Sequence, residues 1–198
     1  MICLIETLQN LHQINYTKMI DKYTGSFHSP FFIFIKGLNH LSDEQILEFL
    51  EFDNCKIRNI EDDIKQSLFI TRDKEWVHIM DNWWYNLWHS DSFRKKIDKL
   101  GEKYDLFYCS MGDCDYSFDV TYYKNGLLRR KYIVDDPDFK GGELIENIGK
   151  PLPFEEENLK NIGQGSKIIS IAKSIGIETN HKLEEISCYQ YDNVFIED

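Results

Sequence analysis

The residues best suited to chemistry stand between positions 78 and 114. A hydrolase or a metal-dependent enzyme could use four of them: His78, Asp81, His89 and Cys114. A thiolate nucleophile needs a neighbouring base, and zinc needs cysteine and histidine ligands at short, regular spacings. The spacings here match no closed zinc module, so we predict no metal site and keep an enzyme using this region as an alternative.

The common catalytic motifs are missing from the chain. It contains no Gly-x-Ser-x-Gly elbow, no phosphate-binding glycine loop, no Gly-x-Gly-x-x-Gly and no His-Glu-x-x-His. The segment that starts at Asp113 begins like a calcium loop, but Phe118 stands where that loop needs glycine and Lys124 where it needs glutamate. We therefore expect no cofactor and favour a function other than catalysis.

An aromatic cluster is a candidate for recognition instead. All the tryptophans of the chain lie between Trp76 and Trp88. Tryptophan joins a large apolar body to an N–H donor, so such clusters occur both in cores and as anchors of binding surfaces. The run Trp83-Trp84-Tyr85 cannot place every ring on one side, which predicts at least one ring near the surface.

The centre of the chain predicts a β-hairpin. From Asp113 to Tyr122, small or polar residues alternate with apolar ones, which is typical of a strand with one face in water. Asn125-Gly126 is the favoured sequence of a type I′ turn, and residues 127–134 return as the partner strand. With those two residues as the loop, we expect Asp119 opposite Tyr132 and near Arg130, on the exposed face.

Acidic residues are in excess, because 34 Asp and Glu face 23 Lys and Arg, a net charge of −11. This charge argues against a general nucleic-acid binder, which needs a surplus of cations. A negative patch beside an exposed indole could instead attract a basic protein. The residues expected to contact such a partner are Trp76, Trp83, Trp84, Asp113, Asp115, Asp119, Asp135 and Asp136.

The remaining segments must position these residues. Apolar spacing predicts helices between Leu4 and Met19, after the capping box of Ser42 and Gln45, from Phe93 onward with Asp91 or Ser92 as N-cap, and over residues 166–175. Further strands are expected at residues 31–35, 67–71, 76–80, 105–111 and 144–148, with residues 187–196 as a closing edge strand. We interpret residues 1–198 as a single α+β domain, with a central, largely antiparallel sheet and helices packed over it. Residues 1–66 could form a helical N-terminal subregion.

The compartment follows from what the chain lacks. Its longest apolar run, Phe31 to Ile35, is far shorter than the roughly 20 apolar residues of a membrane-spanning helix. No basic region precedes the first apolar residues, and the five cysteines are scattered without a Cys-x-x-Cys pair. We expect a cytoplasmic protein with reduced thiols and no membrane partner.

The central block carries a resemblance. The segments Trp76 to Trp88, Gly112-Asp113-Cys114-Asp115, Tyr122 to Gly126 and Arg129 to Tyr132 are similar to small uncharacterised bacterial proteins. Some of those proteins look like immunity proteins of polymorphic toxin systems, and no named family is matched. The resemblance implies a cytoplasmic α+β domain that blocks a toxin by covering its active site. It assigns no functional residue.

The leading hypothesis is therefore a non-enzymatic, acidic binding protein of the immunity type that neutralises a basic toxin. The enzyme described above is one alternative. A globular protein with no strong partner is the other.

Overall fold

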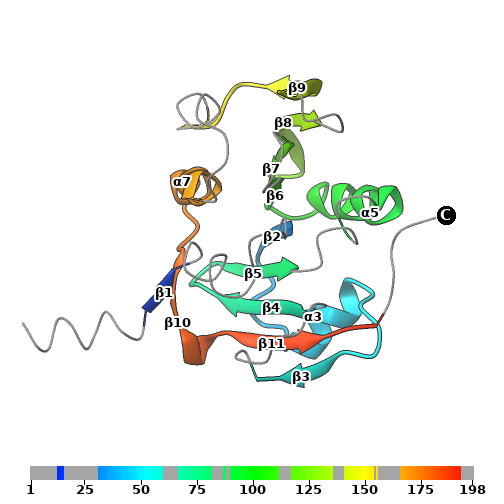
Figure 1. The fold of residues 1–198 in the computed structure, drawn as a ribbon, viewed down its shortest axis with the longest axis vertical. Coiled ribbons are helices and arrows are strands. Elements are labelled where there is room, and N and C mark those ends of the chain that lie inside the picture. The colour runs from blue at the N-terminus through cyan, green and yellow to red at the C-terminus, as the bar shows by residue number, and fades with distance from the viewer. Residues whose placement is uncertain are drawn as a thin grey trace, which may run out of the picture.

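The fold is dominated by one antiparallel sheet of nine strands. The computed structural model describes residues 13–15, 31–59, 67–81, 87, 90–111, 117–135, 141–153, 155 and 166–192. In spatial order the strands are β3 (Lys56–Arg58), β11 (Ser187–Gln190), β4 (Ser67–Arg72), β5 (Trp76–Asp81), β2 (Phe31–Lys36), β6 (Leu106–Met111), β7 (Phe118–Lys124), β8 (Leu127–Asp135) and β9 (Glu143–Gly149). A separate pair joins β1 (Gln13–Asn15) to β10 (Asn180–Lys182). Figure 1 shows that the large sheet is twisted, with β3 at the bottom and β9 at the top.

The helices are short, and their ends obey local rules. Helix α3 (Asp43–Phe49) begins with the predicted capping box, in which the Ser42 hydroxyl accepts from the Gln45 N–H and the Gln45 side chain accepts from the Ser42 N–H. Helix α5 (Asp91–Gly101) is capped by Ser90, so the expected N-cap, Asp91 or Ser92, is wrong. Helix α7 (Ser166–Ser174) and the 3₁₀ turn η2 (Leu183–Glu185) follow late in the chain.

Two hydrophobic clusters form on opposite faces of the sheet. Phe32 and Phe34 of β2 belong to one cluster, to which α7 adds Ile171. Ile33 and Ile35 belong to the other, to which α3 and α5 contribute side chains. Residues 31–35 are fully buried because β5 and β6 pair with the two edges of β2 while the clusters cover its faces.

The predicted hairpin forms, but its face and register differ from the expectation. Asn125 and Gly126 adopt the positive φ angles of the turn, 53° and 73°, as predicted. A bulge between Tyr122 and Tyr123 shifts the pairing, so that Asp119 lies opposite Ile133. The expected exposed face is wrong, because β7 is buried up to its last residue. The strand has β6 on one edge, β8 on the other and packed side chains on both faces.

The α+β class and the antiparallel sheet are confirmed. The described residues do not show a layer of helices over the sheet, because three short helices supply only a few side chains to each cluster. The predicted N-terminal helix is wrong at Gln13–Asn15, which form β1, and the rest of that segment lies outside the described residues. The described part of residues 1–66 also contains β2 and β3, so it is not a helical subregion. Strand β11 lies between β3 and β4 and is not an edge strand.

Candidate functional site

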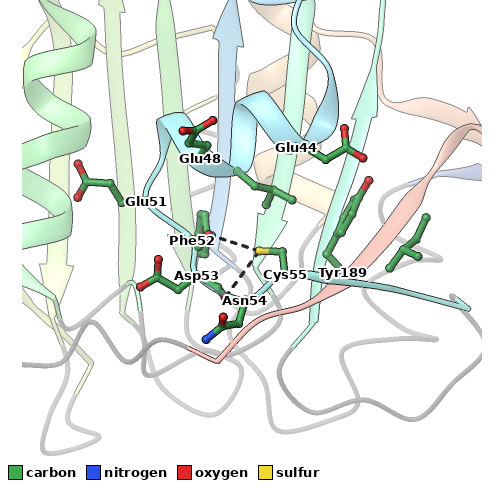
Figure 2. A pocket seen from close by; sticks show the side chains of 10 residues that line it. Glu44, Glu48, Glu51, Phe52, Asp53, Asn54, Cys55 and Tyr189 are labelled. Carbon is green, nitrogen blue, oxygen red and sulfur yellow. Dashed lines mark hydrogen bonds between the residues drawn. The ribbon is translucent and has the colours of Figure 1, made fainter.

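A hollow with acidic walls lies at the β3 end of the sheet, and we call it the acidic pocket (Figure 2). Its volume is about 660 Å³. It is formed by α3, the loop that follows α3, strand β3 and one residue of β11. The residues that line it are Glu44, Leu47, Glu48, Glu51, Phe52, Asp53, Asn54, Cys55, Ile57 and Tyr189.

The shape of the pocket follows from the way the loop leaves α3. Glu51 and Asn54 take positive φ angles of 63° and 53°, and these two residues turn the chain back under the helix. The Phe52 N–H donates to the Leu47 carbonyl at 2.9 Å, and the Phe52 ring packs edge-on against Tyr191 with centroids 4.9 Å apart. The buried phenylalanine therefore anchors the loop while the carboxylates beside it remain in water.

The field in the pocket is negative. Burial and, to a smaller extent, the charges of Asp53 and Asp192 together raise the pKa of the Cys55 thiol to about 11. Burial also raises the pKa of Tyr189 to about 12, with added contributions from Asp43 and Glu44.

Among the described residues, the lining contains no cation, although cations reach its margins. Lys96 of α5 contacts Glu51 at 3.0 Å, and Arg72 pairs with Asp43 just outside the lining. Glu44 and Glu48 stand one turn apart on α3, both in water. Apolar contact surface is supplied by Ile57, which is 71% exposed, whereas the lining residue Leu47 is only 3% exposed. Such a hollow suits a lysine or arginine side chain, whose apolar stem and charged tip need both kinds of surface.

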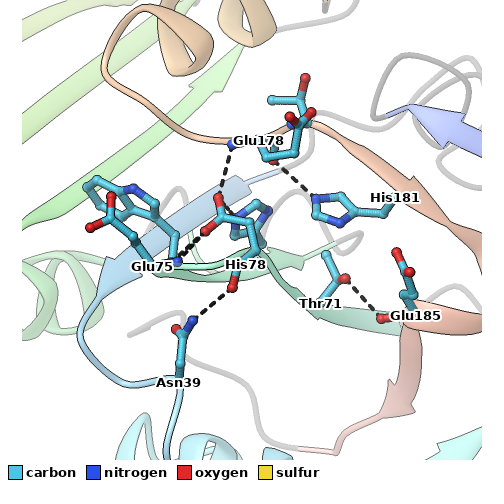
Figure 3. A network of polar contacts seen from close by, with 10 residues as sticks. Asn39, Thr71, Glu75, His78, Glu178, His181 and Glu185 are labelled. Carbon is cyan, nitrogen blue, oxygen red and sulfur yellow. Dashed lines mark hydrogen bonds and ion pairs between the residues drawn. The ribbon is translucent and has the colours of Figure 1, made fainter.

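A second polar cluster joins the β4–β5 turn to the chain ahead of β10 (Figure 3). Oδ1 of Asp73 accepts from the N–H groups of Glu75 and Trp76, both at 2.7 Å. Oδ2 lies 3.0 Å from Nε2 of His78 and accepts from the Glu178 N–H at 3.0 Å. The His78 ring meets the His181 ring edge-on at 4.9 Å.

The pKa shifts of this cluster favour a structural role. Burial raises the pKa of Asp73, but the hydrogen bonds from His78 and the backbone outweigh it and hold the pKa below its usual range. Burial lowers the pKa of His78, which favours the neutral ring, and a neutral imidazole can still donate one N–H to Asp73. A histidine beside a carboxylate resembles part of a catalytic triad, but both oxygens of Asp73 are engaged by donors.

The central acid of the predicted binding surface is in the interior. Asp119 is 0% exposed, contacts Arg94 of α5 at 3.0 Å and accepts from the Thr121 hydroxyl at 3.1 Å. Burial raises its pKa to about 6, against the opposing effect of Arg94. Asp119 therefore cannot contact a partner in this conformation, and that prediction is wrong.

The expected pairing of Asp119 with Arg130 is also wrong. Arg130 lies opposite Tyr122, on the other face of the sheet, because of the bulge. There it is buried and forms a two-pronged ion pair with Glu155, while its Nη1 donates to the Asn147 side chain at 2.7 Å. The Arg130–Glu155 pair fastens the chain after β9 to the sheet.

Of the other seven predicted contact residues, the structure describes two, Trp76 and Asp135. Trp76 is 2% exposed, and the Lys36 ammonium lies 5.9 Å from its ring centre, so it is a core residue. Asp135 is half-buried and accepts from the Ser117 hydroxyl at 3.5 Å. The remaining five lie outside the described residues: Trp83, Trp84, Asp113, Asp115 and Asp136.

The enzyme alternative uses four residues, and the structure describes two of them, His78 and Asp81. These two do not form one site. His78 and Asp81 are three residues apart on β5 and so face opposite sides of the sheet. Asp81 is buried and accepts from the Tyr191 hydroxyl at 2.5 Å. His89 and Cys114 lie outside the described residues. No group of three His, Cys, Asp or Glu residues in the described ranges is arranged to hold a metal ion.

The acidic pocket was not predicted from the sequence, although the sequence contains a signal for it. The segment from Asp43 to Asp53 contains five acidic residues and no basic one. That signal does not place Tyr189, which stands 146 residues after Asp43 and donates to its Oδ2 at 3.0 Å.

Comparison with known proteins leaves the structure to carry the argument. No protein-family model, curated protein or solved structure matches the chain. In the ranges the structure describes, no helix is both long enough and apolar enough to cross a membrane.

Proposed function

We propose that the chain is a non-enzymatic binding protein that takes a basic segment of a partner protein into the acidic pocket. The observation that carries this proposal is the lining of the pocket, which combines four carboxylates with apolar surface and, in the part of the chain the structure describes, has no cation. The partner fits a toxin of basic character, and the chain then acts as its immunity protein by covering the toxin's active site.

The energetics of such a complex divide between the two kinds of surface. Ile57 provides apolar contact for an anchoring side chain of the partner, and such anchors carry most of the affinity in protein interfaces. The carboxylates and the net charge of −11 speed the encounter with a basic surface and select against acidic partners. This moves the expected recognition surface from the hairpin to the α3–β3 end of the sheet, where the acids are exposed.

A binding measurement with charge-reversed variants tests the proposal. The probe is the purified product of the gene adjacent to the one for this chain, titrated against the full-length protein at low and moderate salt. Glu44→Lys/Glu48→Lys should weaken binding roughly tenfold or more, chiefly by slowing association, and added salt should shrink that difference.

A matched control separates the pocket from net charge. Glu102 and Glu184 are exposed and stand outside the pocket lining, so Glu102→Lys/Glu184→Lys makes the same change in total charge. The control should bind within about twofold of the unmodified protein at moderate salt. Equal losses in the two double variants, or no binding by the unmodified protein, would contradict the proposal and favour an enzyme or a protein without a strong partner.

A further inference from the structure

The outer edge of β9 is the second unusual surface of the molecule. In the described part of the chain β9 pairs only with β8, so its other edge carries backbone groups that no described strand pairs. Its apolar side chains stand in water: Leu144 is 51% exposed, Ile145 55% and Ile148 47%. Edge strands of soluble proteins are usually short, charged or covered, because an open apolar edge pairs readily with another strand.

A bulge gives β9 a particular symmetry. Ile133 lies opposite Glu146 and Val134 lies opposite Leu144, so Ile145 is the extra residue. When the bulge is counted as one position, Glu143 lies three positions before Asn147, and Lys150 lies three positions after it. The strand is therefore balanced about Asn147.

We propose that β9 pairs antiparallel with β9 of a second copy of this chain, with Asn147 on the two-fold axis. In this register Ile148 of one copy meets the Ile145–Glu146 bulge of the other. Glu143 of one copy then lies opposite Lys150 of the other, just beyond the end of its strand. The two-fold axis repeats this contact on the other side. A two-fold axis requires such self-complementarity, since every contact is made twice.

The charges of the strand choose the second copy over an unrelated strand. Glu143 and Lys150 stand at opposite ends of the strand and are both exposed. An antiparallel copy matches each with its opposite. Glu146 near the centre already has a cation, because Lys131 of β8 lies 3.2 Å from it, so the two copies do not meet with unneutralised carboxylates at their centre.

The test is the mass of the full chain in solution, measured by light scattering and by sedimentation velocity over a range of concentrations. The unmodified protein should show a concentration-dependent dimer. Glu143→Lys and Lys150→Glu should each raise the dimer dissociation constant roughly tenfold, because each places like charges together twice.

The double variant Glu143→Lys/Lys150→Glu is the decisive control, since it exchanges the partners and should restore the dimer. Circular dichroism and thermal melting verify that all variants fold. A monomer at all concentrations overturns the proposal. A dimer that the single variants leave unchanged, or that the double variant fails to restore after they weaken it, overturns it as well. The result is independent of partner binding at the acidic pocket, since neither of the two positions lies in that pocket.

Discussion

The carboxylates of the acidic pocket and those packed against the hairpin are the same kind of residue in the sequence, but in the fold the first lie in water and the second are buried. Glu44 and Glu48 lie in water with no cation among the residues that line their hollow. Asp119 and Glu155 are fully buried, and each is paired with an arginine. A buried carboxylate needs a partner because the interior solvates charge poorly, whereas an exposed one remains available to another molecule.

The largest effect should come from breaking the pair between Arg130 and Glu155. Arg130→Ala leaves the Glu155 charge buried and the Asn147 side chain without its donor, so we expect a loss of about 3–5 kcal/mol in the free energy of unfolding. Urea denaturation measures it. Arg129→Ala, at the exposed neighbouring residue, is the matched control and should change the stability by less than about 0.5 kcal/mol. A similar small loss for Arg130→Ala would mean that the buried pair does not hold the segment after β9.

A smaller, pH-dependent effect should come from Asp119. Its pKa is raised in the folded state to about 6, so between about pH 4 and pH 6 the folded protein binds more protons than the unfolded chain. The contribution of Asp119 to stability is therefore largest below about pH 4 and is lost as the pH rises through 6. The difference amounts to roughly 2–3 kcal/mol.

Asp119→Asn should remove that part of the pH dependence. Thermal or urea unfolding of the variant and the unmodified protein at several pH values between 4 and 7 gives the comparison. Asp135→Asn, at the end of the same hairpin, is the control and should follow the unmodified protein. If the plots of stability against pH are parallel for Asp119→Asn and the unmodified protein, burial does not raise the pKa of Asp119. The contrast with the exposed acids would then weaken.

The smallest effect should be a change in the reactivity of Cys55 in the acidic pocket, which reports the negative potential there. Asp53→Asn removes one of the charges that raise the pKa of Cys55, although burial, the larger cause, remains. The thiolate fraction at pH 8.5 should rise about two- to threefold, and alkylation of Cys55 by iodoacetamide, followed by peptide mass spectrometry, should speed up by the same factor. Glu184→Gln, away from the pocket, should leave the rate unchanged. Slower or equal labelling of Asp53→Asn would mean that the carboxylate does not act on this hollow.

Local elements could be read from the sequence because neighbouring residues determine them. The Asn125-Gly126 turn needs two residues that tolerate positive φ, and the capping box of Ser42 and Gln45 is complete within four positions. The strand around Phe31–Ile35 was evident from its apolar, β-branched and aromatic composition. None of these depends on contacts with distant parts of the chain.

The face on which Asp119 lies could not be read in the same way. Alternation identified the strand, but it gives the same pattern for an acid in water and for a buried acid that meets an arginine. The arginine is Arg94, 25 residues earlier on α5, and only the packing of that helix beside β7 brings it within 3.0 Å. The bulge in the hairpin had a similar effect, because one extra residue moved Arg130 to the opposite face.

The sequence by itself determined the α+β class, most strands, the hairpin turn and the acidic character of the molecule, since these follow from short-range preferences and from counting charges. The tertiary structure alone decided which acids are buried and paired and which lie in water, because burial and pairing arise between residues far apart in the chain. Tyr189 beside α3 and Glu155 beside Arg130 are brought to their partners by the folding of the whole sheet.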